Sequence, residues 1–273
     1  MAEVGLTGAL LELACLTARE AGALLAGRTG RAEVISTKSS PTDVVTQMDQ
    51  AAEALIRERI GAARPGDAIL GEEGGQTGTG APVRWIVDPL DGTVNYLYDL
   101  PDWAVSIAAE VHGEVVAGAV CAPRRDTLYY GSLGGGSFRA SLRGGEPDRL
   151  ACTTGVPLAR ALIATGFGYE PGRRQVQGEV VSAVLPRVRD IRRNGACALD
   201  LCSLAAGQVD GYYERGVQYW DIAAGSLIAS EAGAVVAGLA GKRAGSAMTV
   251  AGGPGLFAPL HDLLLSLDPE RDA

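Results

Sequence analysis

The chain has 273 residues, with 24 basic and 32 acidic residues that give a net charge of -8. This length suffices for a large core, and an acidic chain without a long basic run argues against nucleic acid as a partner. Five cysteines without C-x-x-C spacing predict reduced thiols in a cytoplasmic protein, and no stretch is long and apolar enough for a membrane span.

Two helices are predicted first. Apolar residues recur at helical spacing over residues 4–26, which predicts an amphipathic packing helix. A break follows, and Asp43 is a good N-cap for a second helix that runs to about Ile60. Asp49 falls inside this second helix, less than about two turns past the cap, where a carboxylate is ordinarily a solvated surface group.

Two short strands are predicted to end in acidic residues. Residues 68–71 are typical of a short strand, and Glu72 and Glu73 follow it directly. Residues 85–87 have the bulk and branching of a buried strand, and they also lead into an acid.

The stretch DPLDGTVN after the second of these strands predicts a metal-holding turn. The proline biases Asp88 towards extended backbone, so its carboxylate leaves at the end of the strand, and Leu90 offers its carbonyl before Asp91. Gly92 can take positive φ and leaves the Thr93 hydroxyl and nearby N–H groups facing the same small space. Hard oxygen donors suit Mg²⁺ or Mn²⁺ better than Zn²⁺, while the alternative is an ordinary Asp-Gly turn after a buried strand.

An antiparallel sheet is predicted by residues 104–111, 115–120 and 128–132, which are short strands joined by tight turns. Of the two histidines, His112 lies in the first of these turns and His261 on a C-terminal helix. Neither lies near an obvious serine or cysteine nucleophile, so carboxylates remain the candidate general bases.

A Gly- and Pro-containing seam at residues 144–148 divides the chain into an N-terminal α+β half, 1–150, and a C-terminal α/β half, 151–273. The second half is predicted to contain strands at 162–166, 211–214 and 249–251, and helices at 175–188, 222–232 and 256–267. A further helix after Gly195 is predicted to carry Leu199, Leu201, Cys202 and Leu204. Gly195 precedes a helix and is either part of an anion site or a plain turn. Asp221 is either the N-cap of its helix or a metal ligand.

Four blocks of this sequence, in matching order and spacing, resemble the inositol monophosphatase family over nearly the whole chain. They are Asp43-Val44-Val45-Thr46 with Asp49, Gly71-Glu72-Glu73, Asp88-Pro89-Leu90-Asp91-Gly92-Thr93 with Asn95, and Trp220-Asp221-Ile222-Ala223-Ala224-Gly225. The resemblance implies an α+β fold, a layered αβαβα sandwich with the site between the two halves, usually assembled as a homodimer. It also implies Mg²⁺-dependent hydrolysis of a phosphate monoester.

The resemblance further implies two or three Mg²⁺ ions, with Mn²⁺ as a possible substitute. Their implied ligands are Glu72, Asp88 and the Leu90 carbonyl for the first ion, Asp88, Asp91 and Asp221 for the second, and Glu73 as support or as ligand to a third. Two such ions about 4 Å apart can activate a water and neutralise charge on the leaving oxygen. Glu72 and Thr93 would hold that water, and Asp49 would orient Thr93.

The implied substrate is a small phosphorylated polyol or sugar, with myo-inositol 1-phosphate leading. The implied contacts are Asp91, Gly92, Thr93, Gly195, Ala196, Cys197, Glu214 and Asp221. Many relatives have a hydroxyl and a small apolar residue where this chain has Ala196 and Cys197, whereas Glu214 fits the inositol pattern. Lys38 matches a mobile-loop lysine of the family.

The motifs leave alternatives open. Histidinol-phosphate phosphatase, fructose-1,6-bisphosphatase and 3'-phosphoadenosine 5'-phosphate phosphatase share the same metal motifs within the superfamily. A non-catalytic regulator on the same fold is the lower-ranked alternative, and it would be favoured by loss of a ligand or of Thr93.

Overall fold

The computed structural model describes residues 2–28, 34–37 and 44–272. Its helices are α1 (Ala2–Ala26), α2 (Gln47–Ala63), α3 (Thr93–Leu97), α4 (Pro171–Val184), α5 (Cys197–Ala205), α6 (Tyr219–Glu231) and α7 (Phe257–Ser266). Its strands are β1 (Val34–Thr37), β2 (Val44–Thr46), β3 (Ala68–Gly71), β4 (Gly75–Thr77), β5 (Val83–Asp91), β6 (Ala104–Val111), β7 (Glu114–Ala122), β8 (Thr127–Ser132), β9 (Gly136–Ser141), β10 (Asp148–Arg149), β11 (Leu162–Thr165), β12 (Asp190–Arg192), β13 (Gly211–Glu214), β14 (Val235–Ala237) and β15 (Thr249–Gly252).

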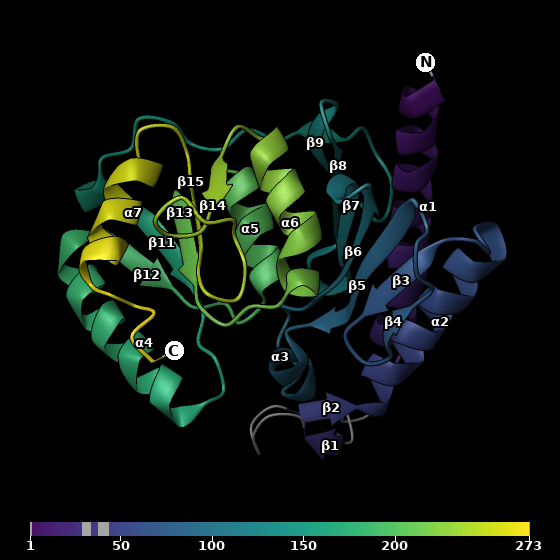
Figure 1. Cartoon of the computed structure of the whole chain (residues 1–273), viewed down its shortest axis with the longest axis horizontal. Coiled ribbons are helices and arrows are strands. Elements are labelled where there is room, and N and C mark those ends of the chain that lie inside the picture. The colour runs from purple at the N-terminus through teal and green to yellow at the C-terminus, as the bar shows by residue number, and fades with distance from the viewer. Residues whose placement is uncertain (1, 29–33, 38–43, 273) are drawn as a thin grey trace.

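Helices and sheets alternate in layers across the molecule (Figure 1). Helices α1 and α2 cover one face of an eight-stranded sheet, α5 and α6 lie between this sheet and a five-stranded sheet, and α4 and α7 cover the outer face of the latter. The predicted α+β class, a layered αβαβα sandwich, is therefore confirmed.

The two sheets differ in strand direction. In the eight-stranded sheet, with order β10-β9-β8-β7-β6-β5-β3-β4, only β3 and β5 pair in parallel among the described strands. In the five-stranded sheet, with order β12-β11-β13-β15-β14, β11 runs parallel to both its neighbours and β15 antiparallel to both of its own. The predicted antiparallel arrangement of β6, β7 and β8 is correct.

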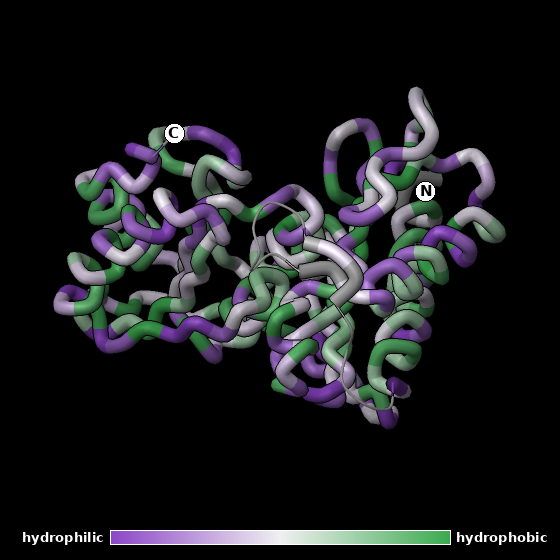
Figure 2. Tube along the Cα trace, turned by 90° about the horizontal axis from the view of Figure 1, so that it is seen from below, coloured by the Kyte–Doolittle hydropathy of each residue, from purple (hydrophilic) through white to green (hydrophobic). Residues whose placement is uncertain are grey.

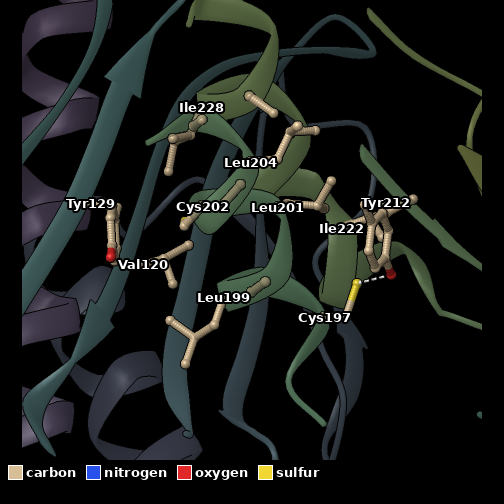
Figure 3. Packing of buried hydrophobic residues seen from close by; sticks show 14 of the residues in the cluster. Val120, Tyr129, Cys197, Leu199, Leu201, Cys202, Leu204, Tyr212, Ile222 and Ile228 are labelled. Atoms are coloured by element: carbon tan, nitrogen blue, oxygen red, sulfur yellow. Dashed lines mark hydrogen bonds between the residues drawn. The ribbon is translucent and has the colours of Figure 1, made fainter. Parts of the chain in front are cut away.

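The core between the sheets is continuous. It contains Val120 of β7, Leu201 of α5, Ile228 of α6 and Tyr212 of β13, all buried (Figure 3). Separate cores lie under α1 and α2 on one side and under α4 and α7 on the other. The middle layer therefore joins the two sheets through side chains that belong to a single hydrophobic cluster.

Hydrophilic and hydrophobic residues alternate along the chain, and hydrophobic stretches occur in outer helices as well as in the interior (Figure 2). In the part of the chain that the structure describes, no helix is long and apolar enough to cross a membrane.

Several predicted boundaries were wrong, and α4 spans Pro171–Val184 where a helix at 175–188 was predicted. Helix α2 begins at Gln47, with Thr46 as its N-cap, because Thr46 and Asp49 form a capping box; Asp43 lies outside the described residues. In α6 the N-cap is Gln218, and Asp221 is the third helical residue. Strand β5 does not end before Asp88 but continues through a bulge to its last residue.

The contact between β7 and α6 leaves no room at Gly118. A Cβ built there would lie 3.0 Å from Ala224 Cα, so α6 rests directly on the sheet at this point. We expect Gly118→Val to lower the free energy of unfolding by about 1–3 kcal/mol through overpacking. Urea unfolding monitored by circular dichroism measures this. Gly61→Val is the matched control, since a Cβ there meets nothing within 4 Å; an equal loss in both variants would contradict the close contact.

Candidate active site

A pocket of about 480 Å³ is lined by residues from both halves of the chain. The polar residues on its wall include Glu72, Asp88, Asp91, Thr93, Arg173, Arg193, Glu214, Gln218 and Asp221. Leu90, Gly92, Gly195 and Cys197 line it as well. The pocket therefore gathers most of the residues singled out in the sequence, although they are up to about 150 positions apart.

A bulge in β5 sets out the first carboxylates. Asp88 pairs with Ser106 and Asp91 with Ala104, so β5 holds one more residue than β6 between these pairs. The Asp88 carboxylate accepts a hydrogen bond from Leu90 N–H at 2.9 Å, which stabilises the extra residue. Because a bulge redirects side chains, both aspartates reach the pocket from a single strand.

The N-terminus of α5 meets Asp91. Asp91 Oδ1 accepts from Cys197 N–H at 3.2 Å, and Oδ2 accepts from Ala198 N–H at 2.8 Å. These are unpaired donors of a first helical turn, which favour a carboxylate. The contact docks the second half of the chain onto the β5 bulge.

A glycine turn brings Thr93 to Asp49. Gly92 has φ 87°, and a Cβ there would lie 2.7 Å from Asp102 O, so only glycine fits this position. The Thr93 hydroxyl then lies 3.2 Å from Asp49 Oδ1 and 3.0 Å from Leu90 O. Asp49 Oδ2 accepts from Thr46 N–H, so the capping box of α2 holds the carboxylate in place.

The remaining acids enter from two other elements. Glu72 follows β3, which pairs in parallel with β5, so it emerges at the same sheet edge as Asp88. Asp221 lies in the first turn of α6, where its Oδ2 accepts from Gln218 N–H at 2.6 Å. The wall therefore combines acids from the large sheet with one from the middle helix layer.

These clustered acids raise one another's pKa values. Burial, followed by the charges of Glu72, Asp91 and Asp221, raises the pKa of Asp88 well above its usual range. Burial raises the pKa of Asp91 to about 7, and burial together with neighbouring acids raises the pKa of Asp221. Such mutual repulsion favours a bound cation.

The donor set fits a hard divalent cation by its chemistry. Glu72, Asp88, Asp91, Asp221 and the Leu90 carbonyl offer only oxygens, the ligands that Mg²⁺ and Mn²⁺ prefer. As they stand, among the described residues no three acid, histidine or cysteine side chains converge on one point. Several of their oxygens instead accept backbone N–H groups.

The pocket lining also includes Glu214, the last residue of β13. Burial raises its pKa to about 7, while a hydrogen bond from Tyr212 and the charge of Arg193 act in the other direction. Arg193 also lies 5.8 Å from the centre of the Phe167 ring. The Glu214 carboxylate can accept hydrogen bonds from hydroxyl groups of a molecule in the same pocket that the acid cluster lines.

Three residues implied in the site lie behind the lining. In the described part of the chain, Asp49, Glu73 and Ala196 are not on the pocket wall. Asp49 reaches it through Thr93, and the Glu73 backbone N–H donates to Glu53 at 2.7 Å. Lys38 lies outside the described residues.

The sequence interpretation assigned no role to Asn95, which connects two loops by hydrogen bonds, or to the positively charged Arg193. Asn95 Nδ2 donates to Asn194 O at 2.8 Å and to Asp102 O at 2.6 Å, so the β5 turn is tied to the loop before α5. Asn95 stood in the resembling block without a role. For Arg193 the only signal was its place beside Gly195, because nothing local indicates that this loop faces Glu214.

Comparison with known proteins agrees with this geometry. Residues 8–266 match the inositol monophosphatase family. An inositol-1-monophosphatase SuhB of Mycobacterium tuberculosis is 48% identical over 258 residues, covering 88% of this chain and 87% of that protein. The solved structure of Mycobacterium tuberculosis SuhB superposes with a TM-score of 0.81 at 43% identity, covering 96% of this chain and 98% of that one. A protein named Nus factor SuhB of Pasteurella multocida is 39% identical, covering 83% of this chain and 84% of that protein.

Proposed function

Because this chain belongs to the inositol monophosphatase family, we propose that it hydrolyses the phosphate monoester of a small polyol, with myo-inositol 1-phosphate as the leading substrate and Mg²⁺ as the ion. The observation that carries this is the pocket itself, whose lining contains both an oxygen-only acid cluster and Glu214. When bound, the ions supply a positive charge for the phosphate and an acidified water.

The residues on the acid side hold the attacking water. Thr93 Oγ1 donates to Asp49 Oδ1 and can therefore accept a hydrogen bond from the water. Glu72 lines the same pocket and accepts a proton from the water as the water attacks phosphorus. Asp49 acts through Thr93, because its own carboxylate is fixed in the capping box.

The turn at Gly92 and Thr93 binds the phosphate oxygens through backbone N–H groups. The substrate then extends towards Gly195, Cys197 and Glu214, where ring hydroxyls meet a carboxylate acceptor. As the P–O bond breaks, the leaving oxygen takes a proton from solvent water and Glu72 releases the proton it accepted, so that one water is consumed and free polyol and inorganic phosphate result. Asp88, Asp91 and Asp221, with Glu72 and the Leu90 carbonyl, would hold the ions.

Ion binding is expected to depend on pH. The folded, ion-free chain keeps a proton on Asp91, whose pKa is raised to about 7, whereas the unfolded chain releases it near its ordinary value. The free energy of unfolding of ion-free protein therefore falls as pH rises from about 4 to about 7. Because Mg²⁺ binds the deprotonated acids, it should raise the melting temperature more at about pH 8 than at about pH 5. Calorimetry with Mg²⁺ or EDTA measures this, and equal shifts at both pH values would contradict it.

The substrate is tested by phosphate release with Mg²⁺ from four esters: inositol 1-phosphate, histidinol phosphate, fructose 1,6-bisphosphate and 3'-phosphoadenosine 5'-phosphate. EDTA serves as the control. We expect the highest kcat/KM with inositol 1-phosphate. Preference for another ester would keep the reaction and replace the substrate.

A non-catalytic role is the second candidate, and the relative named Nus factor SuhB supports it. Against it, Glu72, Asp88, Leu90, Asp91, Thr93 and Asp221 all line the pocket. A protein that only binds a partner has no need of a complete acid cluster. Absence of phosphate release from every ester, despite Mg²⁺-dependent stabilisation, would favour the regulatory role.

Two finer expectations also remain proposals. A homodimer is tested by light scattering of the purified chain. A cytoplasmic location is supported by the cysteines, since all five are free and a reducing compartment keeps thiols in that form.

A further inference from the structure

Cys197, Tyr212 and Glu214 form a hydrogen-bonded chain behind the polyol side of the pocket. The Tyr212 hydroxyl lies 2.9 Å from Cys197 Sγ and 3.0 Å from Glu214 Oε2 (Figure 3 shows the contact to Cys197). The Tyr212 hydroxyl is the donor to the Glu214 carboxylate, which can only accept while it is ionised. The contact with Cys197 Sγ holds the other side of the same hydroxyl.

Tyr212 itself does not touch the cavity. Its side chain is 0% exposed and packs in the core between the sheets, whereas Cys197 and Glu214 both line the pocket. The ring is fixed by that packing, so its hydroxyl is a rigid reference point for the carboxylate.

Gly166 leaves the space that the Glu214 carboxylate occupies. Strands β11 and β13 are parallel, with Ala164 beside Tyr212 and Thr165 beside Tyr213, so Gly166 comes next to Glu214. A Cβ built at Gly166 would lie 2.1 Å from both carboxylate oxygens of Glu214. Any side chain there would displace the carboxylate. Gly166 does not have a positive φ, so the need for glycine at this position is steric.

The chain also reaches the acid cluster. Cys197 donates its backbone N–H to Asp91 Oδ1 at 3.2 Å, and its side chain contacts Tyr212. A single residue thus connects an acid on the phosphate side with the hydroxyl-binding acid on the other.

We propose that Tyr212 and Gly166 are positioning residues that hold Glu214 to read the hydroxyl groups of a polyol phosphate, and so determine the preference for polyol over simple esters. This inference rests on the proposed function. Neither residue takes part in cleavage, so their loss affects substrates according to their hydroxyl groups.

The test compares two substrates in each variant: the best polyol phosphate of the panel above, and p-nitrophenyl phosphate, whose alcohol part has no hydroxyl besides the ester oxygen. Tyr212→Phe removes the hydroxyl and keeps the ring. We expect its KM for the polyol phosphate to rise about tenfold, the effect of one lost hydrogen bond to a charged group. Its kcat/KM for p-nitrophenyl phosphate should stay within about twofold of the wild type.

Gly166→Ala should give the same selective loss, and the double variant should lose less than the product of the two, because both act on Glu214. Tyr213→Phe is the matched control. Tyr213 is the next residue on β13, so its side chain lies on the opposite face of the sheet, where it is buried in the core under α4 and α7. This variant should have wild-type KM and kcat/KM with both substrates.

Equal losses with both substrates, no loss with either, or a selective loss in Tyr213→Phe would overturn the inference. The proposed function is judged separately on wild-type protein. Wild type that prefers another polyol phosphate replaces the substrate, and the variant comparison then proceeds with that ester. Wild type that hydrolyses p-nitrophenyl phosphate and no polyol phosphate overturns both.

Discussion

Asp88→Asn is expected to lower kcat at saturating Mg²⁺ by at least about a thousandfold, because the loss of an ion ligand removes several kcal/mol of transition-state stabilisation. Asp88 is 2% exposed, and its Oδ1 accepts from Leu90 N–H. Asparagine keeps an oxygen that can accept this hydrogen bond, so the β5 bulge persists. The lower kcat then reflects the lost carboxylate charge and not a change of fold. Steady-state phosphate release from inositol 1-phosphate measures it.

The same substitution should stabilise the ion-free protein. Burial and the charges of Glu72, Asp91 and Asp221 raise the Asp88 pKa, which means that its ionised form is unfavourable in the folded state. A neutral amide removes this repulsion, so ion-free Asp88→Asn should melt above the wild type at about pH 8 and gain less from added Mg²⁺. Asp148→Asn, at an exposed pair with Arg139, is the control. Turnover near the wild-type level in Asp88→Asn would remove Asp88 from the site.

Thr93→Ala is expected to lower kcat by about 10²–10⁴, the usual contribution of a group that places and polarises a reacting water. The hydroxyl links the pocket wall to Asp49, whose Oδ1 lies 3.2 Å away. Thr93→Ser keeps the hydroxyl and should retain most of the activity.

Ion binding separates this effect from that of Asp88. Thr93 contributes no carboxylate, so the Mg²⁺-induced rise in melting temperature should persist in Thr93→Ala. Retained activity in Thr93→Ala would place the water elsewhere, and loss of the Mg²⁺ response would make Thr93 part of the ion site instead.

The sequence predicts the parts of this site that depend on local chemistry. The β5 run, the DPLDGT turn and the acids after β3 are each legible from a few consecutive residues, because strand burial and turn formation are local preferences. The sequence also contains the signal for the start of α2, because Thr46 and Asp49 have the spacing of a capping box. The N-cap was nevertheless predicted at Asp43, three residues earlier.

The parts that were missed depend on long-range register. Gly166 lies against Glu214 because β11 and β13 pair in parallel with one particular offset. Asn95 reaches Asn194 across 99 positions. Strands as short as β10 and β12 carry too few residues for a periodic pattern, and they form through pairing with neighbours.

The continuous core between the sheets has a consequence for how the molecule comes apart. Side chains of β6, β7, α5, α6, β13 and β15 share one cluster, so neither half can lose its partner without exposing that apolar surface to water. We expect the chain to unfold in one cooperative transition, and fragments cut near residue 150 to aggregate rather than fold alone. During refolding, hydrolytic activity should return only when the two halves pack together through this cluster. We expect that packing to follow the formation of most of the secondary structure.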